Sequence, residues 1–252
     1  MNAVVYPKGT AKALSRSLRV YHGDAARKAA MDALYANFLK PGDLAFDIGA
    51  HVGDRTSSFR RLGARVVALE PQPGPARALR LIHGRDPQVT LIQAACGDHE
   101  GSIALRINSA NPTVSTASAA FIGAARGAGG WEEQVWDREI TVPCTRLDTL
   151  IQRHGRPDFV KIDVEGFEAH VLAGLTYALP TVSFEFTTIQ RDVAEACLAL
   201  LETLGPYRFN LALGESQRLD FAEAVDAETM GGHIRALPHQ ANSGDVYAVL
   251  SA

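Results

Sequence analysis

Short runs rich in apolar residues alternate with longer amphipathic segments along the first half of the chain. The runs at 44–48, 65–69 and 89–94 have the length of strands, and amphipathic segments at 54–62 and 75–83 lie between them. Runs of this length fit buried strands, and the segments between them fit helices, so the pattern predicts βαβ units and a parallel sheet. Each crossover connection should be right-handed.

The same alternation returns in the second half of the chain. It predicts strands at 139–144, 159–163 and 181–186, followed by helices, and a hairpin-like last pair of strands at 207–213 and 246–250. The helices expected here cover 146–153, 165–175 and 190–204. We therefore expect a Rossmann-like α/β fold with a mostly parallel, doubly wound, seven-stranded sheet and a terminal antiparallel strand.

The pattern breaks after the third strand. A polar turn at 97–101 and an alternating stretch at 102–107 predict a hairpin extension on that strand. Residues 108–130 are rich in Ala, Ser, Gly and Asn and have no clean period. Loops of this length are usually functional or disordered, so the segment is either a mobile cover over a site or a plain flexible insertion.

The N-terminal part predicts a helical cover, 1–40, on a single globular domain at 41–252. Residues 24–39 carry helix formers and an apolar face behind Asp24, which can cap a helix. Residues 1–22 are basic, which is typical of a solvated arm or cover.

Composition and charge narrow the range of partners. The chain has 252 residues, 46% of them hydrophobic, and a formal net charge of −3. Nothing in this balance favours nucleic acid or an anionic membrane, and no apolar run approaches the ~20 residues of a membrane span. The three cysteines are far apart without a CxxC pair, which favours free buried thiols in a reducing compartment. We expect a cytoplasmic protein that binds neither nucleic acid nor membrane.

Acids at three predicted strand ends indicate a binding site. Asp47 lies at the end of the first strand, Glu70 follows the second and Asp163 ends the fourth. After Asp47, Gly49 and Gly53 suit a tight turn into a helix whose free amides can face a ligand. An ordinary βα turn would explain this stretch alone, but ligands of open parallel sheets bind where the carboxyl ends of the strands meet.

The spacing favours a ligand that carries a ribose. Glu70 stands 21 residues after Gly49 (70 − 49), where a carboxylate can accept hydrogen bonds from ribose hydroxyls. The position two after Gly49 is His51, so the loop does not match GxGxxG, and the P-loop pattern GxxxxGK[ST] is absent. A nucleoside-like ligand without a bound pyrophosphate fits better than a dinucleotide.

Several motifs resemble the FkbM family of S-adenosylmethionine-dependent methyltransferases. They are FDIGAHVGD, VVALEPQP, QAACGDHEG, TRLDTL and VKIDVEGFEAHVLAGL, which together run from about residue 41 to 175. The segment IDVEGFE is the most specific of them. The resemblance implies a class I methyltransferase domain at 41–252 with S-adenosyl-L-methionine as cofactor.

The resemblance also implies roles for individual residues. The loop after the first strand would bind the methionine part of the cofactor through Asp47, Gly49, Ala50, His51, Val52 and Gly53. Glu70 would hold the ribose, and Pro71 and Gln72 would shape the adenine slot, closed by Ala95 and Cys96. The family pattern usually has Asn where this chain has His51.

The resemblance places Asp163 beside the sulfonium and the acceptor. Asp163, Glu165 and Glu185 are the candidate general bases, and His51 could also reach the acceptor. Glu165 has another explanation, because acids in the first turn of a helix stabilise its dipole. The three acids could together bind a divalent cation such as Mg²⁺, but their spacing does not demand one and we assign no metal ligands.

The expected reaction is methyl transfer to a hydroxyl group of a small molecule, sugar or natural product. The acceptor would be a small molecule or a glycan, chosen by the first 40 residues and by 108–138, which the family motifs cover poorly. An NAD-dependent oxidoreductase and a non-catalytic nucleoside-binding module are the alternatives. The first would need the glycine that His51 replaces.

Overall fold

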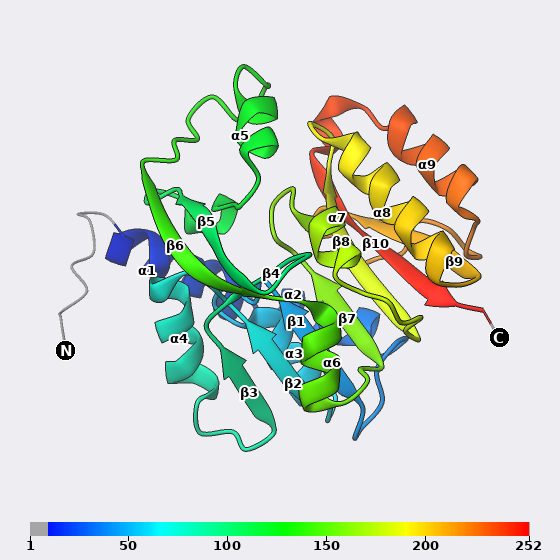
Figure 1. Ribbon diagram of the computed structural model, residues 1–252, viewed down its shortest axis with the longest axis horizontal. Helices are drawn as coiled ribbons and strands as arrows, with labels where there is room; N and C mark the ends of the chain where they lie inside the picture. Colours follow the sequence, from blue (N-terminus) through cyan, green and yellow to red (C-terminus); the bar gives the residue numbers. More distant parts are fainter. Residues whose placement is uncertain (1–9, 252) are drawn as a thin grey trace.

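The computed structural model of the protein describes residues 10–251, and its centre is a seven-stranded sheet (Figure 1). The strand order is β3-β2-β1-β7-β8-β10-β9. These strands are β1 (Leu44–Ile48), β2 (Arg65–Leu69), β3 (Val89–Ile92), β7 (Phe159–Ile162), β8 (Thr181–Thr187), β9 (Tyr207–Leu213) and β10 (Ser243–Leu250). Only β10 runs against its neighbours, β8 and β9. The predicted Rossmann-like sheet with one antiparallel strand is confirmed.

Alternate residues of β1 face two separate cores. Phe46 and Ile48 pack in one hydrophobic cluster, and Ala45 packs in the other. Helices bury both faces of the sheet, which is why its strands read as continuous apolar runs. The first face carries α6 (Leu147–His154), α7 (Glu168–Ala173), α8 (Arg191–Leu204) and α9 (Ala227–Ala236). The second face carries α2 (Ala25–Tyr35), α3 (Asp54–Arg61) and α4 (Pro73–His83).

The predicted hairpin between the third strand and residues 102–107 does not form, because residues 101–107 pair with a later strand. After Ile92 the chain leaves the main sheet and builds a second, three-stranded sheet in the order β4-β6-β5. These strands are β4 (Ala95–Cys96), β5 (Gly101–Ile107) and β6 (Arg138–Thr145). β4 and β5 do not pair, because β6 arrives later in the chain and offers one edge to each of them.

The segment 108–130 is a packed lobe rather than an irregular loop. It contains η1 (Pro112–Val114) and α5 (Ala119–Ala125), and the Ser118 hydroxyl caps α5 by accepting from the Phe121 amide at 3.0 Å. A small core of its own forms from Val114, Phe121, Ala125 and Trp131. The aromatic residues supply the apolar surface that the Ala- and Ser-rich stretch lacks, so the interpretation as a plain insertion does not hold.

Two helices form the N-terminal part that the structure describes. Helix α1 (Thr10–Gly23) precedes α2, and the Asp24 carboxylate caps α2 by accepting from the amides of Ala26 and Arg27. Helix α2 ends at Tyr35, earlier than the predicted 39. Helix α1 contacts η1 of the lobe and also lies against α4 of the main domain (Figure 1), so it links the two. Of the predicted arm or cover at 1–22, residues 10–22 lie in α1, and residues 1–9 lie outside the described residues.

Two further expectations concern thiols and membranes. Cys96, Cys144 and Cys197 are free and buried. Of the helices described between residues 10 and 251, none is long and apolar enough to cross a bilayer.

Candidate active site

A pocket of about 1190 Å³, counted out to its open mouth, lies at the carboxyl ends of β1, β2 and β7. Strand order reverses between β1 and β7, because the chain adds β2 and β3 on one side and returns to the other. Ligands of open α/β sheets bind at such a switch point. The pocket therefore lies where the acids at the strand ends predicted it.

The loop after β1 crosses the end of β7 at very short range. Gly49 has a φ of +86°, and a Cβ added there would lie 1.8 Å from the backbone oxygen of Asp163. The amides of Gly49 and Ala50 both donate to the carbonyl of Leu69, at 3.0 and 2.8 Å, which ties the loop to the end of β2. Only glycine fits this place, both in conformation and in space.

Two of the predicted cofactor-binding residues, Val52 and Gly53, face away from the pocket instead of lining it. The Gly53 carbonyl accepts from Ser57 and lies 3.2 Å from the His83 ring, while the Val52 carbonyl lies 2.9 Å from the His22 ring. The remaining predicted residues of the site all line the pocket: Asp47, Gly49, Ala50, His51, Glu70, Pro71, Gln72, Ala95, Cys96, Asp163, Glu165 and Glu185.

Glu70 joins the two loops that border the predicted ribose position. Its carboxylate is 3% exposed and accepts from the amides of His51, at 2.9 Å, and Gln72, at 2.7 Å. Burial raises the pKa of Glu70 to about 7. Each oxygen accepts one amide and keeps a further lone pair, so the side chain can still accept two hydroxyl groups.

Asp47 lies deeper, at the base of the same loop. It is 2% exposed and accepts a hydrogen bond from the Thr56 hydroxyl. Burial raises the pKa of Asp47 to about 6. No basic side chain among residues 10–251 forms an ion pair with it, so a ligand cation would find an unpaired carboxyl group here.

Helix α1 and the lobe contribute residues to the pocket that the sequence analysis did not single out. Tyr21 of α1 lines the pocket and meets the His51 ring edge-on at 5.6 Å between centroids. Burial raises the pKa of Tyr21 to about 12, although a hydrogen bond with Thr113 of the lobe lowers it. Ser115 lines the pocket from the same lobe. These positions carry no sequence signal, since Tyr21 lies in a basic helix and Thr113 and Ser115 lie in a stretch without a period.

His51 is a poor candidate for the base. Burial lowers the pKa of His51 to about 4, so the ring is neutral and weakly basic at neutral pH. Its Nε2 atom is buried without a hydrogen-bond partner among the described residues.

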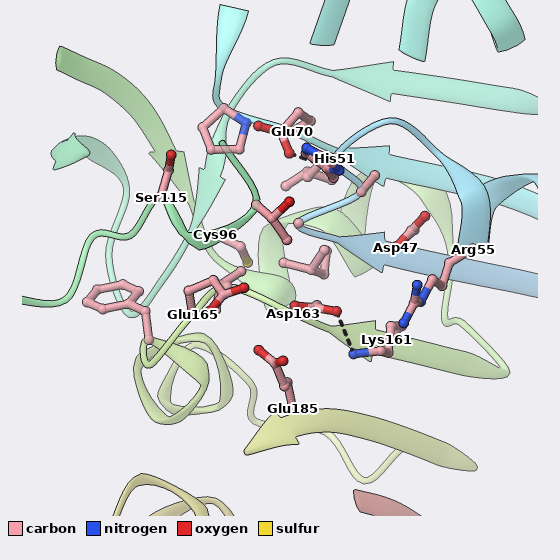
Figure 2. Close-up of a pocket in the computed structure, with 18 of the residues that line it drawn as sticks. Asp47, His51, Arg55, Glu70, Cys96, Ser115, Lys161, Asp163, Glu165 and Glu185 are labelled. Carbon is pink, nitrogen blue, oxygen red and sulfur yellow. Dashed lines mark hydrogen bonds and ion pairs between the residues drawn. The ribbon is translucent and has the colours of Figure 1, made fainter. Parts of the chain in front are cut away.

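Three carboxylates meet on the side of the pocket opposite Glu70. Figure 2 shows Asp163, Glu165 and Glu185 turned toward the same space, and one oxygen of each lies within 4.8 Å of the others. Asp163 follows β7, Glu165 lies in the turn before α7, and Glu185 comes from β8. The three candidate bases therefore lie together at one side of the pocket.

The predicted position of Glu165 in the first turn of a helix is wrong. Glu165 has a φ of +58° and Gly166 one of +82°, so both lie in a left-handed turn, and α7 begins at Glu168. Glu168 holds the turn through bonds from the amides of Val164, at 3.0 Å, and Gly166, at 3.3 Å. Stabilisation of a helix dipole therefore does not explain Glu165.

A buried lysine that the sequence analysis overlooked divides the acids into two groups. Lys161 of β7 is 0% exposed, and its Nζ lies 3.2 Å from Asp163 and 2.9 Å from Asp245. Burial lowers the pKa of Lys161, but the two carboxylates outweigh burial and raise it well above its usual value. The sequence signal that could have revealed this ion pair is a lysine within the apolar run Phe159–Ile162, because a buried charge needs a partner.

The pKa values of the three acids shift in opposite directions. Burial would raise the pKa of Asp163, but Lys161 and Arg55 outweigh it and hold that pKa below its usual value. Burial raises the pKa of Glu165 well above its usual value, and Asp163 adds to the effect. Burial and then Glu165 do the same for Glu185. The site thus pairs an ionised aspartate with two glutamates that hold protons more tightly.

Residues 47–216 match the family described as "Methyltransferase FkbM domain". No curated protein matches the chain.

Similar solved structures share little sequence with this chain. An O-methyltransferase from Bacillus cereus in complex with SAH has 11% identity and a TM-score of 0.47, covering 99% of this chain and 94% of that one. Precorrin-6y C5,15-methyltransferase from Geobacter metallireducens has 15% identity and a TM-score of 0.46, covering 89% and 86%. These likenesses carry no conclusion about activity. The family match spans more than half of the chain, and the chain therefore belongs to the FkbM family, the S-adenosylmethionine-dependent methyltransferases that its motifs resemble.

Proposed function

We propose that the protein transfers a methyl group from S-adenosylmethionine to a hydroxyl group of a small molecule, sugar or natural product. The observation that carries the proposal is the pair of glutamates, buried Glu165 and half-buried Glu185, at the far side of a pocket whose near side carries Glu70. A net charge of −3 gives nucleic acid no advantage as the acceptor.

The residues present fit the cofactor. Glu70 keeps two lone pairs for ribose hydroxyls, and the unpaired Asp47 offers a carboxylate to an amino group. Pro71, Ala95 and Cys96 line a largely apolar slot beside Glu70, which suits a base. When bound, the cofactor supplies the methyl group as an activated sulfonium.

The protein's own contribution is to align the acceptor and to take its proton. A general base contributes typically ~10²–10⁴-fold, and it works best when its pKa is near the working pH. Asp163 is paired with Lys161 at 3.2 Å and has a lowered pKa, which makes it the weaker base. Glu165, with its raised pKa and no basic partner among residues 10–251, is the base we propose. Asp163 would then act through its negative charge.

The family match favours a transferase over the NAD-dependent oxidoreductase. The non-catalytic module keeps the cofactor pocket but predicts no turnover, and an activity assay separates it from the proposed enzyme.

The test begins with cofactor binding. Saturating S-adenosylmethionine or S-adenosylhomocysteine should raise the melting temperature of the wild-type protein, and Glu70→Ala should remove most of the shift. Methyl transfer to a panel of hydroxyl compounds is then followed by release of S-adenosylhomocysteine. Glu165→Gln should lower kcat by about 10²-fold or more while leaving cofactor affinity in place.

Glu195→Gln is the matched control, because Glu195 pairs with Arg235 on the surface with 42% of its side chain exposed. It should leave both measurements unchanged. A wild-type protein whose melting temperature does not respond to either cofactor form would refute the proposed function.

A further inference from the structure

The acceptor side of the pocket holds more carboxyl groups than the described residues supply with cationic partners. Asp163 is paired with Lys161, but neither Glu165 nor Glu185 forms an ion pair with any described residue. Glu165 is only 7% exposed, and no side chain or amide in the described part of the chain donates a hydrogen bond to its carboxylate. Glu185 keeps a buried Oε2 without a partner. Both face into the pocket (Figure 2).

The basic side chains that line the pocket already have partners. Lys161 is held by Asp163 and Asp245. Arg55 lies 2.7 Å from Asp54 and 3.4 Å from Glu215. Among the described lining residues, only these two side chains are permanently cationic. An acceptor with a carboxylate or phosphate near the reacting atom would meet no free cation and would be repelled by the glutamates.

We propose that the methyl acceptor carries a protonated amine, and that its ammonium group binds between Glu165 and Glu185. This inference rests on the proposed methyl-transfer function and names the class of its acceptor. An ammonium group has up to three N–H donors, so it can satisfy both carboxylates and the buried Oε2 atom of Glu185 together.

Two other cations fit the same space less well. A divalent metal ion on the three carboxylates would share Asp163 with the Lys161 ammonium, 3.2 Å away, and hard divalent ions take six or more oxygen ligands. The sulfonium of the cofactor has positive charge but no hydrogen to donate, so it would leave the oxygen atoms of Glu165 and Glu185 without hydrogen bonds.

The ammonium anchors the acceptor and does not receive the methyl group. A protonated amine has no free electron pair, so the new C–O bond forms at the neighbouring hydroxyl oxygen. The bond from the methyl carbon to sulfur breaks with its electron pair going to sulfur. The hydroxyl proton goes to Glu165, which the ammonium keeps ionised until then.

The test measures binding to protein saturated with S-adenosylhomocysteine, at pH 7 and constant ionic strength. Two matched sets of probes differ in one group only: glucosamine, glucose and glucuronate, and tyramine, 4-ethylphenol and 4-hydroxyphenylacetate. In at least one set the amine should bind about tenfold or more tightly than the neutral member, as expected for a charge-assisted hydrogen bond. The anionic member should bind most weakly.

Variants connect the preference to the two glutamates. Glu165→Gln and Glu185→Gln should each reduce the preference for the amine to less than about threefold and leave S-adenosylhomocysteine affinity in place. Glu165→Asp keeps the charge and should keep the preference for the amine over the acid. Glu195→Gln should retain the wild-type order, because it changes a surface charge outside the pocket.

Several outcomes would overturn the inference. One is an absence of amine preference in both sets, including the absence of any binding by the two amines. Another is tight binding of Mg²⁺ or Mn²⁺ that Glu165→Gln and Glu185→Gln abolish. Failure to bind S-adenosylhomocysteine would instead remove the proposed function itself, so the two failures are distinguishable.

Discussion

Replacing Lys161 by methionine removes the cation that the half-buried Asp163 and the buried Asp245 share. The lysine side chain is 0% exposed, and its Nζ lies 3.2 Å from Asp163 and 2.9 Å from Asp245. Methionine keeps most of the apolar stem, so the change is mainly one of charge. Removing one partner of a buried pair typically costs about 3–5 kcal/mol, because the remaining charge is left uncompensated. For a chain of this size that corresponds to a fall in melting temperature of about 6–20 °C.

The cost of Lys161→Met should depend on pH in a defined direction. In the wild type Lys161 holds the pKa of Asp163 below its usual value, so the stability from this carboxylate is present above about pH 4 and is lost as the pH falls. In the variant Asp163 loses its nearest cation and keeps only the more distant Arg55, so it should hold its proton to higher pH. The deficit of the variant should therefore be larger at pH 7.5 than at pH 5.5.

Urea unfolding at the two pH values measures both effects. The double variant Lys161→Met/Asp245→Asn removes one of the unpaired carboxylates and should recover part of the loss. Arg235→Met is the control, since Arg235 and Glu195 form an exposed pair with side chains 57% and 42% exposed, and such pairs are worth at most about 1 kcal/mol. A loss for Lys161→Met no larger than for Arg235→Met, or one that does not change with pH, would refute the reasoning.

Three further outcomes are expected. Gly49→Ala should abolish cofactor-induced stabilisation in a melting assay, since its Cβ would lie 1.8 Å from a backbone oxygen, whereas Gly127→Ala, with a similar φ of +77° and nothing within 4 Å, should cost only about 1–2 kcal/mol. Melting temperature without ligand should fall between pH 6.5 and 8, because burial raises the pKa of Glu70 and Glu168 to about 7. An acid whose pKa is raised by folding stabilises the folded state while it is protonated, and that stability is lost as the pH rises; a flat profile would contradict this. Phe121→Ala should cost about 3–5 kcal/mol within the lobe, seen as faster hydrogen exchange in 112–136 than in the main sheet; uniform acceleration would show that the lobe is not a separate unit.

The main sheet was predictable because its signals are local. Each residue of β1 is buried, so the strand reads as an apolar run, and the turns before and after it carry glycine or proline. The second sheet was not predictable from neighbouring residues. β5 pairs with β6, which begins at Arg138, and nothing in the sequence between them marks which strand will become the partner.

The lobe and the turn at Glu165 show two different limits. The core of the lobe brings Phe121 against Trp131 at 5.2 Å between ring centroids, a contact without a repeating period that a pattern could reveal. At Glu165, an acid followed by glycine and further helix formers predicted the start of a helix. The backbone instead enters the left-handed region at two residues in succession, which turns the carboxylate into the pocket.

The charge balance of the site depends on pairing that residue types alone do not determine. The acids at 163, 165 and 185 were all candidate bases in the sequence, although Glu165 had a second explanation in the dipole of a predicted helix. The structure separates them through Lys161, which pairs with Asp163 just after its own strand and with Asp245 from a strand more than eighty positions along the chain. Because Lys161 is paired with Asp163 and Asp245, no described cation is left to pair with Glu165 and Glu185. The binding experiment with matched amines, neutral compounds and acids therefore tests whether the acceptor supplies that positive charge.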